Sequence, residues 1–185
     1  MADVLRYGIV GAGMMGREHM RNIVAVPGGE VVAIADPHAA SVEAAREIVS
    51  GVASTDSVEA LVARDDLDVL VIATPNFTHR NVVEQAMASG LHLLIEKPLC
   101  TTVADCLELE ALLESYPGIA WVGMEYRYSP LVARLIEEVR GGATGTPRMV
   151  SIREHRFPFL PKVGDWNRFA RNTGGTLVEK CCHFF

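Results

Sequence analysis

The chain has 185 residues, of which 49% are apolar, so it is long enough for one packed domain and part of a second. Lysine and arginine total 17 against 23 aspartates and glutamates, and the resulting net charge of −6 argues against a nucleic-acid binder, which needs a basic face. No apolar run approaches the roughly 18 residues of a membrane span, and the four cysteines lack the spacing of a zinc site. We therefore expect a cytoplasmic protein with reduced thiols, without a metal and without nucleic-acid or membrane partners.

Apolar runs alternate with helical patterns over the first 124 residues, which is typical of a parallel sheet with crossover helices. The predicted strands cover residues 4–10, 30–35, 52–54, 68–73, 92–95 and 120–124. The predicted helices cover residues 14–26, 41–49, 57–63, 79–89 and 103–115. Residues 1–124 are therefore expected to form an α/β domain of the Rossmann type, with a doubly wound parallel sheet.

The pattern changes after residue 124, where we expect a domain boundary. Residues 131–140 form a strongly amphipathic predicted helix, residues 148–157 a predicted strand of a different sheet, and residues 158–175 a predicted loop. A helix begins to form at Glu179, but a single late strand has no partners for its backbone groups. We therefore expect residues 125–185 to be the incomplete beginning of a second domain, mobile after about residue 146.

A glycine loop follows the first predicted strand and opens the first predicted helix. In Gly11-Ala12-Gly13-Met14-Met15-Gly16, the first glycine permits a tight turn, the second admits a diphosphate, and the third lets the helix pack on the sheet. The helix N-terminus offers N–H groups to the phosphates. Asp36 ends the second strand, where its carboxylate can bind the adenosine ribose and repel a 2′-phosphate. This arrangement predicts a dinucleotide site that prefers NAD over NADP.

Two further motifs stand at the carboxyl ends of predicted strands, where ligands bind in open parallel sheets. They are Thr74-Pro75-Asn76-Phe77-Thr78-His79 and Glu96-Lys97-Pro98. Near the C-terminus come Gly174-Gly175 and then Glu179-x-x-x-His183. With the glycine loop, this set in this order resembles the Gfo/Idh/MocA oxidoreductase family, which includes inositol and glucose–fructose oxidoreductases.

The resemblance implies a Rossmann half followed by an α/β half with a mainly antiparallel sheet, which binds substrate and commonly builds a homo-oligomer. It implies that Lys97 is the catalytic lysine and that His183 exchanges the hydroxyl proton. Glu179 stands where many members have Asp, and a helical i, i+4 spacing would put it on one face with His183. The expected cofactor site comprises Gly11, Ala12, Gly13, Met14, Met15, Gly16, Asp36, Thr74, Pro75, Asn76, His79, Glu96 and Lys97. For His79, a residue at the helix start near the nicotinamide pocket is favoured over a catalytic one.

The expected activity is hydride transfer between NAD and a secondary alcohol of a cyclic polyol or sugar. Candidate substrate residues are Tyr126, Arg156, Trp166, Asn167 and Arg168, of which the last three form a polar and aromatic cluster that would suit a sugar or simply pack as a loop. Two alternatives stay open. Some relatives use bound NAD for transient oxidation in elimination or glycoside cleavage, and others sense the dinucleotide without catalysis.

Overall fold

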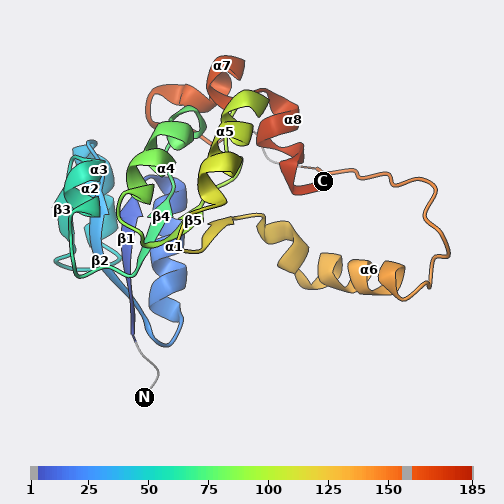
Figure 1. Ribbon diagram of the computed structural model, residues 1–185, viewed down its shortest axis with the longest axis horizontal. Helices are drawn as coiled ribbons and strands as arrows, with labels where there is room; N and C mark the ends of the chain where they lie inside the picture. The colour runs from blue at the N-terminus through green and yellow to red at the C-terminus, as the bar shows by residue number, and fades with distance from the viewer. Residues whose placement is uncertain (1–3, 156–159, 185) are drawn as a thin grey trace.

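The computed structural model describes residues 4–155 and 160–184, and its centre is a six-stranded sheet (Figure 1). The strands are β1 (Leu5–Val10), β2 (Gly29–Ala35), β3 (Ala53–Thr55), β4 (Val69–Ile72), β5 (His92–Ile95) and β6 (Ala120–Val122). Their order across the sheet is β3-β2-β1-β4-β5-β6, and every neighbouring pair is parallel. The winding direction therefore reverses between β1 and β4, which confirms the predicted doubly wound topology.

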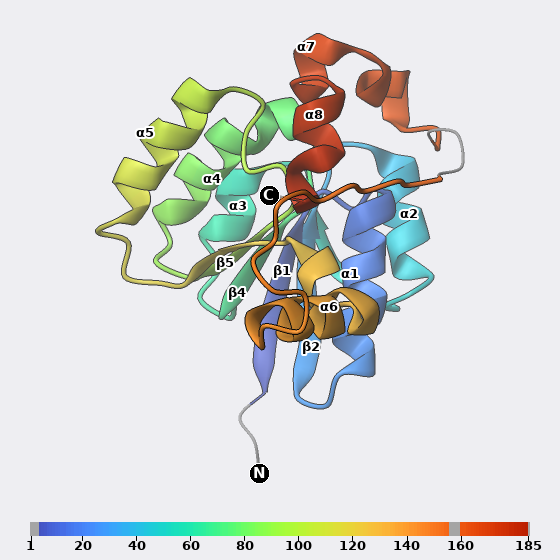
Figure 2. The same ribbon diagram turned by 90° about the vertical axis from the view of Figure 1, so that its right-hand side faces the viewer.

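Helices cover both faces of this sheet (Figure 2). On one face lie α1 (Met14–Ala25) and α2 (Ala39–Arg46), and on the other lie α3 (Val58–Val62), α4 (His79–Met87) and α5 (Val103–Leu113). Every helix and strand predicted before residue 124 is present, with ends shifted by a few residues. The largest shift is at α2, which begins and ends earlier than the predicted 41–49.

Apolar side chains fill the space between the sheet and both helical layers. Leu70, Ile72 and Leu93 belong to the cluster beneath α3, α4 and α5, while Ile9 and Ile34 belong to the cluster beneath α1 and α2. All four residues of β4 are buried, because a parallel strand covered on both faces has no side exposed to water. This packed sheet is the rigid base for the loops at its carboxyl edge.

The glycine loop between β1 and α1 sets how closely the helix approaches the sheet. Gly11 has a φ of +91°, in the left-handed region, and a Cβ there would lie 2.8 Å from the carbonyl oxygen of Ala73. A Cβ on Gly16 would lie 1.9 Å from the carbonyl oxygen of Gly11. Both positions therefore require glycine, and together they bring the start of α1 against the carboxyl ends of β1 and β4.

Beyond β6 the chain leaves the sheet and then returns to its carboxyl edge (Figure 1). The amphipathic helix predicted at 131–140 is present as α6 (Pro130–Arg140), and its apolar Leu131 is 87% exposed. In the described residues, five short helices or turns flank α6, one before it and four after it. They are η2 (Glu125–Tyr128), η3 (Val163–Arg168), α7 (Ala170–Thr173), α8 (Thr176–Glu179) and, last, η4 (Cys181–Phe184).

Two sequence predictions for this segment are wrong. Residues 148–155 form no strand, and positions 156 and 157 of the predicted strand lie outside the described residues. A strand needs a neighbour for its backbone N–H and C=O groups, and no strand lies after Val122 in the described part of the chain. For the same reason the antiparallel sheet is not seen there. The predicted loop at 158–175 instead contains η3 and α7.

The four cysteines are free thiols, and burial, with Cys106 beside it, raises the pKa of Cys100 to about 12. Among residues 4–155 and 160–184, no group of three His, Cys, Asp or Glu side chains is arranged to hold a metal. Within the same residues, every helix is too short or too polar to cross a membrane.

Replacing Gly16 with alanine tests the close approach of α1. The new Cβ would overlap the Gly11 carbonyl, which is backbone, so we expect Gly16→Ala to lower the free energy of unfolding by about 3 kcal/mol or more. Urea titration followed by circular dichroism measures this. Gly13→Ala is the matched control, because a Cβ at Gly13 would meet no atom within 4 Å. Equal stability of the two variants would contradict the packing argument.

Candidate active site

A cavity of about 1400 Å³ lies at the carboxyl edge of the sheet, between the glycine loop and the returning C-terminal segment. Its wall on the Rossmann side includes Gly11, Gly13, Met14, Met15, Asp36, Thr74, Pro75, Asn76, Phe77, Glu96 and Lys97. The opposite wall includes Lys162, Trp166, Asn167, Glu179, Lys180 and His183. The cavity therefore brings together most of the predicted cofactor residues with the three predicted catalytic residues, Lys97, Glu179 and His183.

The N-terminus of α1 forms one end of this cavity. Gly13 is the N-cap of α1, and the N–H of Arg17 donates to the Gly13 carbonyl at 3.0 Å, so the preceding N–H groups of the first turn have no partner within the helix. The first turn contains no acidic residue. Unpaired N–H groups and the helix dipole together favour an anion at this position.

Asp36 stands beside the glycine loop at the end of β2. Its Oδ2 accepts a hydrogen bond from the Ala12 N–H at 2.8 Å, and its Oδ1 accepts one from the His38 N–H at 2.8 Å. These two bonds fix the carboxylate at the cavity rim, on the same side as the α1 N-terminus.

Two features show that these residues fit a dinucleotide. A Cβ on Gly13 would project into open space within the cavity, which leaves room for a diphosphate to approach the backbone. Asn76 is 7% exposed, and its side-chain Nδ2 has no hydrogen-bond partner among the described atoms. A buried donor without an acceptor is unfavourable, and the oxygens of a dinucleotide would satisfy it.

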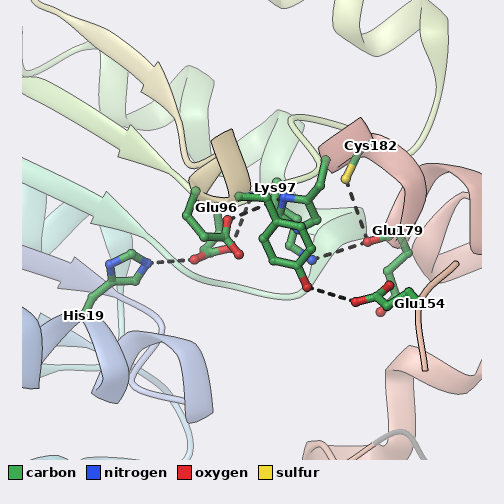
Figure 3. Close-up of polar contacts among 9 residues, drawn as sticks. His19, Glu96, Lys97, Glu154, Glu179 and Cys182 are labelled. Carbon is green, nitrogen blue, oxygen red and sulfur yellow. Dashed lines mark hydrogen bonds and ion pairs between the residues drawn. The ribbon is translucent and has the colours of Figure 1, made fainter. Parts of the chain in front are cut away.

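Glu96 connects the dinucleotide end of the cavity to Lys97 (Figure 3). His19, from α1, donates from Nε2 to Glu96 Oε1 at 2.7 Å, and the other carboxylate oxygen accepts the Lys97 N–H at 3.2 Å. Burial alone raises the pKa of Glu96, but the hydrogen bond from His19 and the nearby charges of His19 and Lys97 outweigh it and hold the pKa below its usual value. Glu96 is therefore a buried carboxylate that stays ionised because His19 holds it.

The ammonium of Lys97 points toward the C-terminal segment (Figure 3). Its Nζ donates to the backbone carbonyl of Glu179 at 3.3 Å, and the thiol of Cys182 lies 3.8 Å from the same oxygen. In a continuous helix that carbonyl would accept the N–H of residue 183. Instead α8 ends at Glu179 and η4 begins at Cys181, so the prediction that Glu179 and His183 share one helix face is wrong.

The two predicted acid–base residues of the C-terminal segment have different neighbours. Glu179 is 8% exposed, and its carboxylate lies 3.2 Å from Lys180 Nζ. The imidazole of His183 stacks on Tyr126 at 4.1 Å between ring centroids, with its Nδ1 3.6 Å from Glu125 Oε2. His183 thus lies on the cavity wall in a fixed orientation, while Glu179 is paired with its own neighbour along the chain.

Several predicted site residues do not line the cavity. His79 is fully buried, with Nδ1 2.8 Å from the Pro98 carbonyl and Nε2 3.0 Å from the Thr74 carbonyl, so it joins the two loops from below. Burial lowers the pKa of His79, against the opposing effect of these carbonyls. Four other predicted residues also lie outside the cavity wall. Ala12 and Gly16 shape the glycine loop, Tyr126 stacks on His183, and Arg168 pairs with Asp165. Arg156 lies outside the described residues.

Sequence reasoning missed His19, Lys162 and Lys180. His19 lies one helical turn after Gly16, on the side of α1 that faces β5, and that spacing could have indicated its direction. Lys162 and Lys180 could have been noticed by their rarity. The whole chain contains only three lysines, and the third is Lys97, a predicted catalytic residue.

Replacing His19 with alanine tests the support of Glu96. Without its donor, Glu96 becomes a buried, poorly paired carboxylate, so we expect the free energy of unfolding at pH 7 to fall by roughly 3 kcal/mol. In the native protein the lowered pKa makes Glu96 stabilising above its unfolded pKa, and this is lost as the pH falls through the folded pKa. In His19→Ala, burial raises the pKa of Glu96, because the opposing hydrogen bond is gone. The difference in free energy of unfolding between wild type and variant should therefore become smaller as the pH falls.

Urea titrations at pH 7 and pH 4.5 measure this difference. His19→Gln retains an amide donor at a similar position and should recover part of the stability. A deficit in His19→Ala that is the same at both pH values would mean that only packing was lost.

Comparison with known proteins identifies the family of the chain. The model of the Gfo/Idh/MocA family, described as an oxidoreductase family with an NAD-binding Rossmann fold, matches residues 5–124. An inositol 2-dehydrogenase of Corynebacterium glutamicum (strain R) is 36% identical over 149 residues, covering 78% of this chain and 44% of the relative. The chain spans about half the length of the curated relatives it matches.

Solved structures have the same fold. The crystal structure of an NAD-binding protein from Listeria innocua aligns with a TM-score of 0.85 at 27% identity, covering 97% of this chain and 52% of that one. The crystal structure of myo-inositol dehydrogenase from Lactobacillus casei in complex with NAD(H) and myo-inositol aligns with a TM-score of 0.72 at 28% identity, covering 78% of this chain and 43% of that one. The chain belongs to the Gfo/Idh/MocA family of oxidoreductases and carries their NAD-binding Rossmann fold.

Proposed function

We propose that the protein is an NAD-dependent dehydrogenase that oxidises a secondary alcohol of a cyclic polyol or sugar. The observation that carries this proposal is the position of Lys97, whose Nζ lies in the cavity 3.3 Å from the Glu179 carbonyl, opposite the wall that contains His183. Relatives named inositol 2-dehydrogenase support the substrate class. The proposal takes residues 1–124 as the dinucleotide-binding domain and residues 125–185 as the beginning of a substrate domain.

Different residues of the chain bind the cofactor, bind the substrate hydroxyl and take its proton. The α1 N-terminus holds the diphosphate, Asp36 binds the adenosine ribose, and Asn76 donates to an oxygen of the cofactor. A bound nicotinamide supplies the hydride acceptor. Lys97 binds the substrate hydroxyl oxygen and stabilises negative charge that develops on it. His183 takes the hydroxyl proton, since an imidazole titrates near neutral pH.

Glu96 acts through Lys97 and not on the substrate. Its bonds to His19 and to the Lys97 N–H orient the strand end from which the lysine side chain leaves. The resemblance to the family also supports a homo-oligomer of the full-length protein, and the net charge of −6 with four free cysteines favours the cytoplasm.

Gly13→Ala tests the diphosphate site. A methyl group at this position projects into cavity space, so we expect the Kd for NADH to rise at least about tenfold while the free energy of unfolding stays within about 0.5 kcal/mol of wild type. Titration of NADH fluorescence and a urea melt measure the two quantities. Unchanged NADH affinity would place the diphosphate elsewhere.

Asp36→Asn tests the choice of dinucleotide. Removing one negative charge near a 2′-phosphate should reduce the preference for NADH over NADPH by about tenfold or more. Fluorescence titrations with both dinucleotides give the ratio. Asp66→Asn, at the opposite edge of the sheet, removes the same charge and should leave the ratio unchanged. A native protein that binds both dinucleotides equally would contradict the assignment of Asp36.

Lys97→Ala tests the catalytic assignment. We expect turnover of the best substrate in a panel containing myo-inositol, glucose and glucuronate to fall by about a thousandfold, while the Kd for NADH changes less than about threefold. The assay follows net NADH formation from NAD and the free polyol, so it also separates oxidation from elimination or glycoside cleavage. Turnover that survives in Lys97→Ala would remove the lysine from the mechanism.

A further inference from the structure

All the lysines of the chain meet in one place. The sequence contains three, Lys97, Lys162 and Lys180, and each of them lines the cavity. Every other Lys or Arg position in the sequence is an arginine. The three lysines come from separate parts of the fold. Lys97 follows β5, Lys162 precedes η3, and Lys180 follows α8. The fold therefore brings three ammonium groups to one cavity, Lys97 from the Rossmann wall and Lys162 and Lys180 from the opposite wall.

The buried carboxylates of this cavity already have partners. Lys180 Nζ lies 3.2 Å from Glu179 Oε1, and Glu96 accepts its hydrogen bond from His19 at 2.7 Å. Lys97 Nζ is held by a neutral carbonyl, that of Glu179, at 3.3 Å. Two other cavity carboxylates, Glu125 and Glu154, lie beside His183 and Tyr126. No carboxylate of the described residues lies within ion-pair distance of Lys97 Nζ, although Glu96 is close enough for the two charges to interact.

Lys162 is the least compensated of the three. Its ammonium lies 6.0 Å from the Trp166 ring centroid, and in the described part of the chain no carboxylate lies within ion-pair distance of it. Burial, followed by the positive charges of Lys180 and Lys97, lowers the pKa of Lys162, against the opposing charges of Glu96 and Glu179. An anion bound among these lysines would relieve the repulsion between them.

The dinucleotide does not account for this cluster. Its diphosphate belongs at the α1 N-terminus and its adenosine ribose at Asp36, both on the Rossmann wall. Lys162 and Trp166 lie on the opposite wall, where the indole offers an apolar face to a sugar ring and the ammonium offers charge to a substituent of that ring.

We propose that the substrate is an anionic polyol or sugar, whose carboxylate or phosphate group binds Lys162 beside Trp166 while the hydroxyl to be oxidised faces Lys97. This inference rests on the proposed function and narrows it, because it separates this protein from dehydrogenases of uncharged inositols. Lys180 is already paired with Glu179, so it adds only a longer-range electrostatic attraction for the anion.

The test measures binding to the full chain saturated with NADH, where an alcohol cannot be oxidised. Isothermal titration uses glucuronate, glucose 6-phosphate and myo-inositol as probes. We expect the better of the two anions to bind at least about tenfold more tightly than myo-inositol, and which anion wins identifies the acidic group. Lys162→Gln should abolish that advantage, and Lys162→Arg should retain most of it. Arg171→Gln removes one exposed positive charge from the same segment and should change nothing.

Three outcomes would overturn the inference. Myo-inositol could bind as tightly as both anions to the native protein, Lys162→Gln could weaken all three ligands equally, or it could weaken NADH instead. A separate assay with NAD distinguishes this failure from that of the proposed function. Anion binding that depends on Lys162, without net NADH formation from any probe, would keep the anion site and reject the dehydrogenase. Oxidation of myo-inositol without an anion preference would keep the dehydrogenase and reject the anion site.

Discussion

The contact of α1 with the glycine loop is the constraint on which the site depends. No side chain fits between Gly16 and the carbonyl of Gly11, so the helix begins directly against the carboxyl ends of β1 and β4. This position leaves the N–H groups of the first turn at the wall of the cavity. It also brings His19, one turn further along α1, to the end of β5, where it holds the carboxylate of Glu96. One close packing contact thus prepares both an anion site and the support of Lys97.

The C-terminal segment completes the cavity from the other side. The carbonyl of Glu179 accepts from Lys97 across 82 positions of sequence, at the point where α8 ends and before η4 places His183 on the cavity wall. The stacking of His183 on Tyr126 then limits the orientation of the imidazole. The same segment supplies Lys162, Lys180 and Trp166, which line the wall opposite the glycine loop.

The Rossmann half could be predicted well from the sequence, because its signals are local. Continuous apolar strands such as Val69–Ile72, the glycine loop and Asp36 each follow from neighbouring residues and a known periodicity. The C-terminal half could not, since residues 148–155 have β-like composition but no partner strand in the described chain, and pairing is not a local property.

The polar contacts of the site were equally hard to predict. Whether Glu179 faces His183 or Lys180 depends on where α8 ends, and its last carbonyl bonds to Lys97, a residue 82 positions away in the sequence. His79 was predicted beside the cofactor because it follows the Thr-Pro motif, but both of its ring nitrogens face backbone carbonyls beneath the cavity.

A crystal structure of the protein with NADH would locate the dinucleotide directly. We expect a diphosphate within hydrogen-bonding distance of the first-turn N–H groups at Met14 and Met15, with the adenosine ribose on Asp36 and the nicotinamide near Lys97. A dinucleotide bound elsewhere, or density showing side chains that fill the space beside Gly13, would contradict it.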